Sequence, residues 1–409
     1  MKKGNKCSFC GSPKEAVAIL IEGKEAFICE GCVSQAQKII DEALKPQENK
    51  FQFNLSKNIK PKDIAAFLDQ YIIGQDEAKK TLSVAVYNHY KRLNQKVDND
   101  DVEIEKSNIL LVGETGTGKT LLARSIAKFL NVPFAIVDAT VFTEAGYVGE
   151  DVESILSRLL QACNYDVASA EKGIVYIDEI DKISRKGDNP SLTRDVSGEG
   201  VQQAMLKLLE GTEVLVPPHG GRKHPEQKLI KVNTQNILFI CGGAFDGISK
   251  IISSRLQSHA IGFKSNSSQK VIDKENYLQY VSPLDIRRFG LIPELIGRLP
   301  IVTHLNPLDK EALLSILTKP KNALIKQYQK LFFLEGIKLD FSTEALEFIV
   351  EKAFDLKLGA RGLRSICEAI MIDLMFELPS DKNVKHFVVT EEICRGKINK
   401  EKIEQLKAA

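Results

Sequence analysis

The stretch Ile109-Leu-Leu-Val-Gly-Glu-Thr-Gly-Thr-Gly-Lys-Thr120 decides the fold class of this chain. Its first four residues form a short apolar run, and its last eight satisfy the pattern G-x-x-x-x-G-K-[ST]. A helical pattern from Leu121 to Leu130 follows directly. The motif therefore has the strand before it and the helix after it that a phosphate-binding loop requires.

The residues of this loop are expected to hold the phosphates of ATP. Backbone N–H groups of the glycine-rich turn and the N-terminus of the helix attract negative charge. Lys119 should reach the β- and γ-phosphates, and Thr120 should be a ligand of Mg²⁺. The predicted nucleotide-binding positions are Gly113, Glu114, Thr115, Gly116, Thr117, Gly118, Lys119, Thr120 and Leu121.

A second apolar run, Ile174–Ile177, ends in the acidic pair Asp178 and Glu179. Asp178 is expected to hold Mg²⁺, directly or through water, and Glu179 is expected to polarise the attacking water as a catalytic residue. Such a pair is a weak signal alone, but its position after a phosphate-binding loop favours an ATP hydrolase over a kinase or a simple nucleotide binder. We interpret the neighbouring Asp181 and Lys182 as polar residues at the start of a helix.

Two more apolar runs, Phe134–Val137 and Ile237–Ile240, alternate with helical patterns. This alternation predicts an α/β fold in which helices cover a parallel sheet. We place the sheet domain, a P-loop ATPase domain, at residues 63–305. Residues 306–409 predict a small, mainly helical C-terminal domain. Its candidate helices are Leu308–Lys330 and Ser342–Ala353.

Four cysteines near the N-terminus form two C-x-x-C pairs, Cys7 with Cys10 and Cys29 with Cys32. Their spacing predicts a closed four-thiolate Zn²⁺ site, which is structural because no coordination position is left open for catalysis. A module at residues 1–44 buries too little apolar area to fold alone, so the metal should supply much of its folding free energy. Unliganded thiols are one alternative. A redox role for one pair is another, but it would not explain the second pair.

The composition excludes several classes of protein. A chain of 409 residues is too long for one compact core. Its 56 Lys and Arg against 54 Asp and Glu leave a net charge of +2, without the basic excess of a nucleic-acid coating protein. No apolar run approaches the roughly 18 residues needed to span a bilayer. The charged segment Met1–Lys6 leads directly into the first cysteine pair, unlike a signal peptide. We expect a cytoplasmic protein with no membrane partner, in which the polar residues 45–62 are a linker.

With these motifs, the chain resembles the ClpX family of AAA+ ATP-dependent unfoldases. A four-Cys module joined to this ATPase distinguishes the family within AAA+ proteins, and the resemblance extends to about residue 380. It implies a homo-hexamer that uses ATP hydrolysis to unfold protein substrates, with adaptors as further partners, and to translocate them into the ClpP peptidase. Chaperone activity without ClpP is also implied. The C-terminal domain would be the small AAA+ domain.

The resemblance also implies further residues at the nucleotide. Ile73 would lie beside the adenine, Arg361 would sense the γ-phosphate, and Arg298 would be the catalytic arginine finger that reaches the nucleotide of a neighbouring subunit. From the residues alone, Arg298 is equally well a structural ion-pair residue. One element departs from the wider AAA+ pattern, because the strand after the acidic pair usually ends in Asn, Thr or Ser. Here Ile240 leads into Cys241 and two glycines, so the residue that positions the water is left open.

Two short segments are implied to contact other polypeptides. Tyr147 and Val148, between glycines, resemble the loop that grips the substrate in the pore of the ring, although such a Tyr also packs on its own domain in many turns. The tripeptide Ile261, Gly262 and Phe263 resembles the segment that docks on ClpP. Its alternative is a buried corner of the core, but its polar flanks indicate an exposed loop.

The rival function is a nucleic-acid remodelling ATPase, such as a helicase loader, with the zinc module on DNA. The near-neutral charge and the lack of a basic cluster among the cysteine pairs count against it, so no nucleic-acid partner is expected. The sequence carries neither H-E-x-x-H nor G-x-S-x-G. Peptide cleavage is therefore expected to come from a partner.

Overall fold

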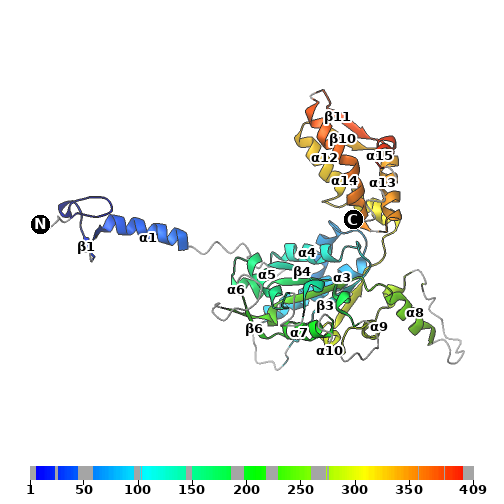
Figure 1. Cartoon of the computed structure of the whole chain (residues 1–409), viewed down its shortest axis with the longest axis horizontal. Helices are drawn as coiled ribbons and strands as arrows, with labels where there is room; N and C mark the ends of the chain where they lie inside the picture. The colour runs from blue at the N-terminus through cyan, green and yellow to red at the C-terminus, as the bar shows by residue number, and fades with distance from the viewer. Residues whose placement is uncertain are drawn as a thin grey trace. The chain divides into compact units, whose positions relative to one another are not determined.

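The structure, a computed structural model (Figure 1), describes residues 6–23, 26–44, 59–95, 102, 104–143, 150–185, 198–217, 229–258, 273, 276–357, 359–381 and 383–398. The chain folds as two units, Met1–Lys50 and Phe51–Ala409, and the division falls inside the predicted linker. Within the described ranges, every helix is too short or too polar to span a membrane.

The N-terminal unit is a small hairpin followed by a helix. Strand β1 (Leu20–Glu22) pairs antiparallel with β2 (Phe27–Cys29), and α1 (Glu30–Leu44) starts at the next residue. The side chain of Glu30 accepts hydrogen bonds from the backbone N–H groups of Ala18 and Ile19, which ties the helix to the hairpin. The hairpin lies between the two cysteine pairs along the chain, and Cys29 is its last residue.

A parallel sheet forms the centre of the second unit (Figure 1). Within the described residues it has five strands in the order β4-β5-β8-β3-β9. The four strands predicted from apolar runs are confirmed, whereas β9 was not predicted because its four residues include Thr303 and His304. The strands are β3 (Ile109–Val112), β4 (Phe134–Asp138), β5 (Ile174–Asp178), β8 (Leu238–Gly243) and β9 (Ile301–His304).

Helices cover both faces of this sheet, so the central strands are apolar along their whole length. Side chains alternate between faces along a strand, and Ile109 and Leu111 accordingly pack under one layer of helices while Leu110 and Val112 pack under the other. The first layer contains α2 (Pro61–Asp69), α3 (Asp76–Leu93) and α4 (Lys119–Leu130). The second contains α5 (Ser154–Ala162), α7 (Glu199–Glu210), α8 (Ile248–Ser258), α9 (Pro283–Phe289) and α10 (Pro293–Gly297).

Shorter elements complete the large lobe. Helix α2 starts at Pro61, a favourable first position for proline, so the predicted linker ends two residues earlier than expected. The antiparallel strands β6 and β7 form a separate hairpin. The remaining elements are β6 (Glu213–Val216), β7 (Ile230–Asn233), α6 (Val167–Ala170) and the 3₁₀ turns Ala139–Val141, Ile180–Ile183, Thr234–Asn236 and Tyr277–Tyr280.

The C-terminal lobe is mainly helical, as predicted, with a pair of parallel strands. The expectation of one helix at Leu308–Lys330 is wrong, because the chain breaks at Pro320, where a helix would lack a backbone donor. The helix expected at Ser342–Ala353 is confirmed, with Ser342 as its N-cap. The elements are α11 (Lys310–Thr318), α12 (Leu324–Leu334), β10 (Lys338–Phe341), α13 (Thr343–Asp355), α14 (Ala360–Glu377), β11 (His386–Val389) and α15 (Glu391–Lys397).

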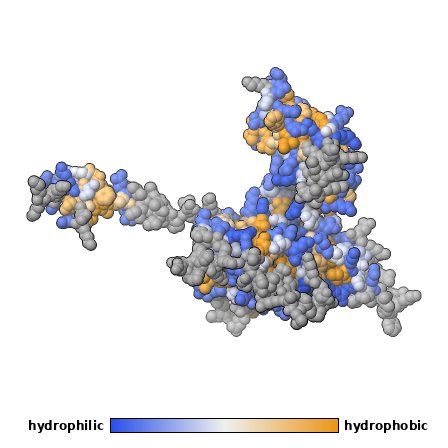
Figure 2. Space-filling view, viewed as in Figure 1, coloured by the Kyte–Doolittle hydropathy of each residue, from blue (hydrophilic) through white to orange (hydrophobic). Residues whose placement is uncertain are grey.

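Hydrophobic side chains gather on the surface of this lobe (Figure 2). Phe333 and Leu334 on α12 are each 68% exposed, and Phe376 on α14 is 83% exposed. Large exposed apolar patches mark surfaces that other molecules cover.

Hydrogen bonds from one side chain and from the backbone join the two lobes beside the phosphate-binding loop. The side-chain amide of Gln75 donates to the carbonyl of Asn306 at 2.9 Å and accepts from its N–H at 2.7 Å. The N–H of Lys321 donates to the carbonyl of Gln70 at 2.9 Å. The segment between α2 and α3 is therefore held against the connection from β9 to α11 through Asn306 and against the connection from α11 to α12 through Lys321.

Candidate functional site

The phosphate-binding loop connects the end of β3 to the start of α4. Gly116 and Gly118 have φ of 82° and 104°, a region that favours glycine. Gly113 lacks a side chain for a different reason, since a Cβ there would lie 2.9 Å from that of Leu305. The loop thus depends on glycine both for its turns and for its packing.

Lys119 lies at the first residue of α4 with its side chain buried. Its Nζ donates to the carbonyl oxygens of Gly113 at 2.5 Å and Glu114 at 2.9 Å, so it folds over the loop. Burial lowers the pKa of Lys119, and the negative charge of Asp178 opposes that shift. Among the residues that the structure describes, no carboxylate is in hydrogen-bond contact with this buried ammonium, which fits a site that receives an anionic phosphate.

The side chains of Thr120 and Asp178 form a hydrogen bond. Thr120 Oγ1 donates to Asp178 Oδ2 at 3.0 Å, joining the start of α4 to the end of β5. Hydroxyl and carboxylate oxygens are the ligands that Mg²⁺ prefers. The pair therefore fits the metal that accompanies ATP.

Glu179 follows directly, with a left-handed backbone at φ 56°. Partial burial raises the pKa of Glu179, and the negative charges of Asp138 and Asp178 add to the effect. A carboxylate with a raised pKa is a better proton acceptor once ionised.

Asp181 lies in the first turn of the 3₁₀ helix Ile180–Ile183, as expected for a residue at a helix start, and its side chain is buried. It is 3% exposed, and its Oδ1 accepts a hydrogen bond from the N–H of Ala244 at 3.1 Å. The Nζ atom of Lys182 lies 3.4 Å from Oδ2 of Asp181 and 3.4 Å from Oδ2 of Asp246. The two residues therefore join the ends of β5 and β8, and periodicity could not reveal this because the partners lie on another strand.

These residues line a cleft of about 320 Å³ between the two lobes. The small lobe closes it through α14, where the N–H of Ala360 donates to the carbonyl of Gly116 at 3.2 Å. Arg364, one helical turn after Arg361, was missed as a site residue although the i, i+3 spacing puts both on one face. The lining residues are Thr115, Gly116, Gly118, Lys119, Thr120, Leu121, Asp178, Glu179, Asp181, Lys182, Ala244, Ala360, Arg361 and Arg364.

Some predicted nucleotide-binding residues lie beside this cleft rather than on its wall. Gly113 and Thr117 are buried under the loop, and Glu114 is exposed at its edge. Ile73 is half-buried between α2 and α3. Within the described residues, none of these four lines the cleft.

Arg298 lies outside the cleft of its own chain. It follows α10, and its guanidinium pairs with Glu210, with Nη2 2.9 Å from Oε1. The side chain of Arg298 is 53% exposed, so the pair contributes little and is easily exchanged for another. The ion pair weighed as an alternative is present, and it leaves the guanidinium accessible.

Five predicted contact residues lie outside the described residues. They are Tyr147, Val148, Ile261, Gly262 and Phe263.

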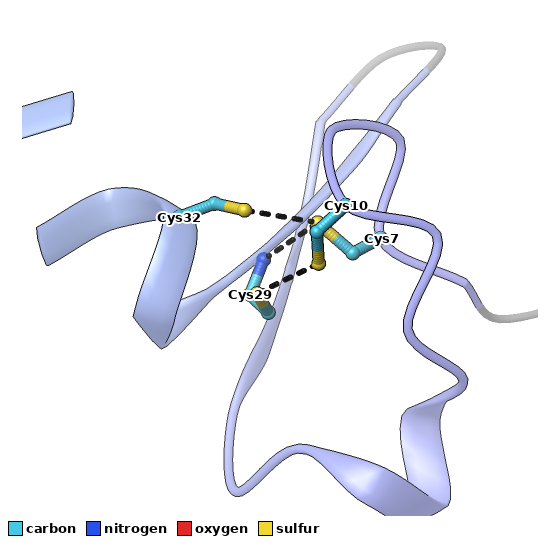
Figure 3. A group of neighbouring side chains, drawn as sticks. All are labelled: Cys7, Cys10, Cys29 and Cys32. Carbon is cyan, nitrogen blue, oxygen red and sulfur yellow. Dashed lines mark hydrogen bonds between the residues drawn. The ribbon is translucent and has the colours of Figure 1, made fainter. Parts of the chain in front are cut away.

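The four N-terminal cysteines converge on one point (Figure 3). All four Sγ atoms lie within 4.8 Å of one another, with Cys7 and Cys32 3.8 Å apart and Cys10 and Cys29 3.6 Å apart. A tetrahedral zinc site with Zn–S bonds near 2.3 Å has sulfurs about 3.8 Å apart. The backbone N–H of Cys10, with those of Phe9 and Cys29, lowers the pKa of Cys7 to about 6, which favours the thiolate that binds metal. The set fits Zn²⁺.

Comparisons with known proteins agree with this arrangement. Three family models match the chain: an AAA domain (Cdc48 subfamily) at residues 104–302, a ClpX C4-type zinc finger at residues 5–42, and the C-terminal D2-small domain of ClpB protein at residues 308–391.

Similar proteins match over almost their whole length. A Bacteroides thetaiotaomicron protein is 61% identical over all of this chain and 99% of its own length. A Bacteroides fragilis protein is 60% identical with the same coverage, and a Porphyromonas gingivalis protein is 60% identical over 96% of each chain. All three are named ATP-dependent Clp protease ATP-binding subunit ClpX.

We predict that the purified protein carries about one Zn²⁺ per chain and that Cys29→Ser releases it. Without the metal, residues 6–44 should become sensitive to protease, because the metal supplies their folding free energy. Elemental analysis and limited proteolysis measure both effects. Cys163→Ser, the same change at a buried cysteine far from this group in sequence, should keep the metal. Finding no zinc in freshly purified, reduced protein would contradict the prediction.

Proposed function

Since the chain belongs to the ClpX family of ATP-dependent Clp protease ATP-binding subunits, we propose that it unfolds proteins with the energy of ATP hydrolysis and translocates them into the ClpP peptidase. It is an AAA ATPase with ATP and Mg²⁺ as cofactors and Zn²⁺ in its N-terminal finger. The observation that carries the proposal is the Thr120–Asp178 hydrogen bond, with Glu179 in the same cleft. In this proposal the protein is cytoplasmic and peptide cleavage belongs to the partner.

The proposed mechanism assigns one role to each group in the cleft. Lys119 exchanges its bonds to the loop carbonyls for phosphate oxygens. Thr120 and Asp178 would hold Mg²⁺, which would supply positive charge against the phosphates. Glu179 orients the attacking water and accepts its proton. Arg361 contributes positive charge from the small lobe.

The nucleotide is proposed to set the position of the small lobe. Arg361 and Arg364 belong to α14, whereas Lys119 and Asp178 belong to the large lobe, so the same ligand contacts both bodies. Loss of the γ-phosphate removes an anion that these cations share. Movement of one lobe against the other is the expected mechanical output.

We propose a homo-hexamer, and the position of Arg298 and the apolar surface of the small lobe support contacts between subunits. Arg298 is accessible but does not line the cleft of its own chain, as an arginine finger acting on a neighbour requires. Packing between subunits would bury exposed side chains such as Phe333 and Phe376. We propose that each nucleotide site is completed by the next subunit.

Two segments outside the described residues are proposed to contact polypeptides, and their flanks are anchored. Phe142 and Glu150 form a β-bridge at the ends of residues 144–149, where Tyr147 and Val148 are proposed to grip the substrate. The guanidinium of Arg255 donates to the backbone carbonyl of Tyr280 at 2.6 Å. The N–H of Asp273 donates to the side-chain hydroxyl of Tyr280 at 3.2 Å. Tyr280 thus holds both sides of residues 259–272, which contain the proposed ClpP dock.

Glu179→Gln is predicted to bind ATP and leave it unhydrolysed, with turnover lowered about 100-fold or more, because the carboxylate is lost while the shape is kept. Lys119→Ala should instead weaken ATP binding, because a charged phosphate partner is removed. Turnover assays and binding of a fluorescent ATP analogue separate the two effects. Near-normal turnover by Glu179→Gln would refute its role.

Arg298→Ala is predicted to lower turnover about 1,000-fold while nucleotide stays bound. Mixing it with Glu179→Gln subunits should restore part of the activity, since some interfaces then combine an intact Arg298 with an intact Glu179. Glu210→Gln is the matched control, because it breaks the ion pair and keeps the guanidinium. Equal losses in the Arg298 and Glu210 variants would show that only the ion pair matters.

Phe263→Ala is predicted to abolish delivery to ClpP while ATPase activity and unfolding persist. Burying one such side chain contributes roughly 1.5–3 kcal/mol, and repetition around a ring adds avidity. The assay follows a stable fluorescent protein with a degradation tag in the presence of ATP, with and without ClpP. Tyr147→Ala should do the reverse, losing substrate grip and keeping the dock. A melting temperature lowered in step with degradation would instead place Phe263 in the core.

A further inference from the structure

Tyr176 lies two residues before Asp178 on β5, so both side chains project from the same face of the sheet. Its ring is fully buried among the apolar residues beneath α2, α3 and α4. Its hydroxyl donates to Asp178 Oδ1 at 3.2 Å. A phenol hydroxyl is a hydrogen-bond donor near neutral pH, so Tyr176 donates and the carboxylate of Asp178 accepts.

The carboxylate of Asp178 receives donors on both oxygens. Oδ1 accepts from Tyr176 and from the N–H of Glu179 at 3.1 Å, whereas Oδ2 accepts from Thr120. The oxygen shared with Thr120 is the one placed beside the phosphate-binding loop. Rotation of the carboxylate would break the two hydrogen bonds to Oδ1, so these bonds fix the orientation of the Asp178 side chain.

Gly242 on the neighbouring strand β8 explains how the tyrosine reaches this position. A Cβ at Gly242 would lie 2.1 Å from Tyr176 Oη and 2.8 Å from Cζ, closer than any real contact. Gly242 is opposite Leu111 of β3 and has no positive φ, so its backbone does not require glycine. The phenol of Tyr176 therefore fills the space into which a side chain at position 242 would project.

The contact of Tyr176 with Asp178 offers a reason why β8 ends in two glycines and not in the Asn, Thr or Ser of the wider AAA+ pattern. A polar side chain ending β8 would approach the nucleotide from its own strand. Here the space at Gly242 is taken by a hydroxyl that comes from β5 and contacts Asp178.

We propose that Tyr176 is a positioning residue for Mg²⁺–ATP, whose hydroxyl holds Asp178 with Oδ2 directed at the metal, and that Gly242 is needed to admit it. The inference rests on the proposed ATPase site. Groups that hydrogen-bond a metal-binding carboxylate typically change metal affinity by about 10- to 100-fold when they are removed.

The test uses full-length protein carrying Glu179→Gln, so that ATP is not consumed. Binding of a fluorescent ATP analogue is titrated with Mg²⁺, and its affinity is also measured in EDTA. Tyr176→Phe should raise the Mg²⁺ midpoint about tenfold. Its affinity in EDTA should be unchanged, because Lys119 and the loop remain.

Tyr90→Phe is the matched control. Tyr90 is also fully buried in the same apolar cluster, and its hydroxyl donates to the carbonyl of Lys172 at 3.0 Å, away from Asp178. It should lower the melting temperature as Tyr176→Phe does and leave the Mg²⁺ midpoint unchanged. Equal midpoints in the two tyrosine variants would overturn the inference.

Gly242→Ala tests the same contact with the tyrosine retained. The added methyl must displace the phenol, so the Mg²⁺ midpoint should rise as in Tyr176→Phe. A folded Gly242→Ala protein with the parental midpoint would overturn the inference. If the parent protein binds the analogue without any effect of Mg²⁺, the proposed ATPase site itself fails, and the inference fails with it.

Discussion

The hydrogen bond between Thr120 and Asp178 is the contact on which the arrangement of the site depends. It joins the helix after β3 to the end of β5, two strands that are separated by β8 in the sheet. Parallel strands bring their carboxyl ends to one edge, so residues 58 positions apart in the chain meet there. The apolar layers on both faces of the sheet hold that edge in place. Lys119, Glu179 and Asp181 take their positions from the same two strands and their loops.

The second lobe makes this edge into a cleft. The N–H of Ala360 bonds to the carbonyl of Gly116, and a Cβ at Gly359 would lie 3.0 Å from that oxygen. Gly359 also has a positive φ, so the start of α14 can approach the phosphate-binding loop only with glycine there. A ligand that contacts both the loop and Arg361 therefore senses the distance between the lobes. This close approach supports the proposed coupling of hydrolysis to movement of the small lobe.

The two units depend on different interactions for their stability, burial of apolar area in the larger unit and metal binding in the smaller one. In the larger unit, residues such as Leu111 and Tyr176 have no exposed surface, and burial of apolar area supplies the driving force. The cysteine-containing unit has short strands in which Ile21 is half exposed, so it buries little. Its four sulfurs lie where one metal ion would join the two cysteine pairs. Metal binding and folding are therefore expected to be one process in that unit.

The sequence by itself determined the features that depend on local pattern. The phosphate-binding loop and the strands β3, β4, β5 and β8 are each encoded within a few consecutive residues. The cysteine spacing and the helical periodicity of the small lobe extend over longer segments, but both are patterns along the chain, so periodicity and motif spacing were sufficient. The tertiary structure alone decided the edge strand β9, the buried role of Asp181 and the contact of Tyr176 with Asp178 beside Gly242. In the last two cases the side chains involved sit against a neighbouring strand. A chain pattern records which face a residue takes, but the strand order that selects its neighbours arises only when the whole sheet packs.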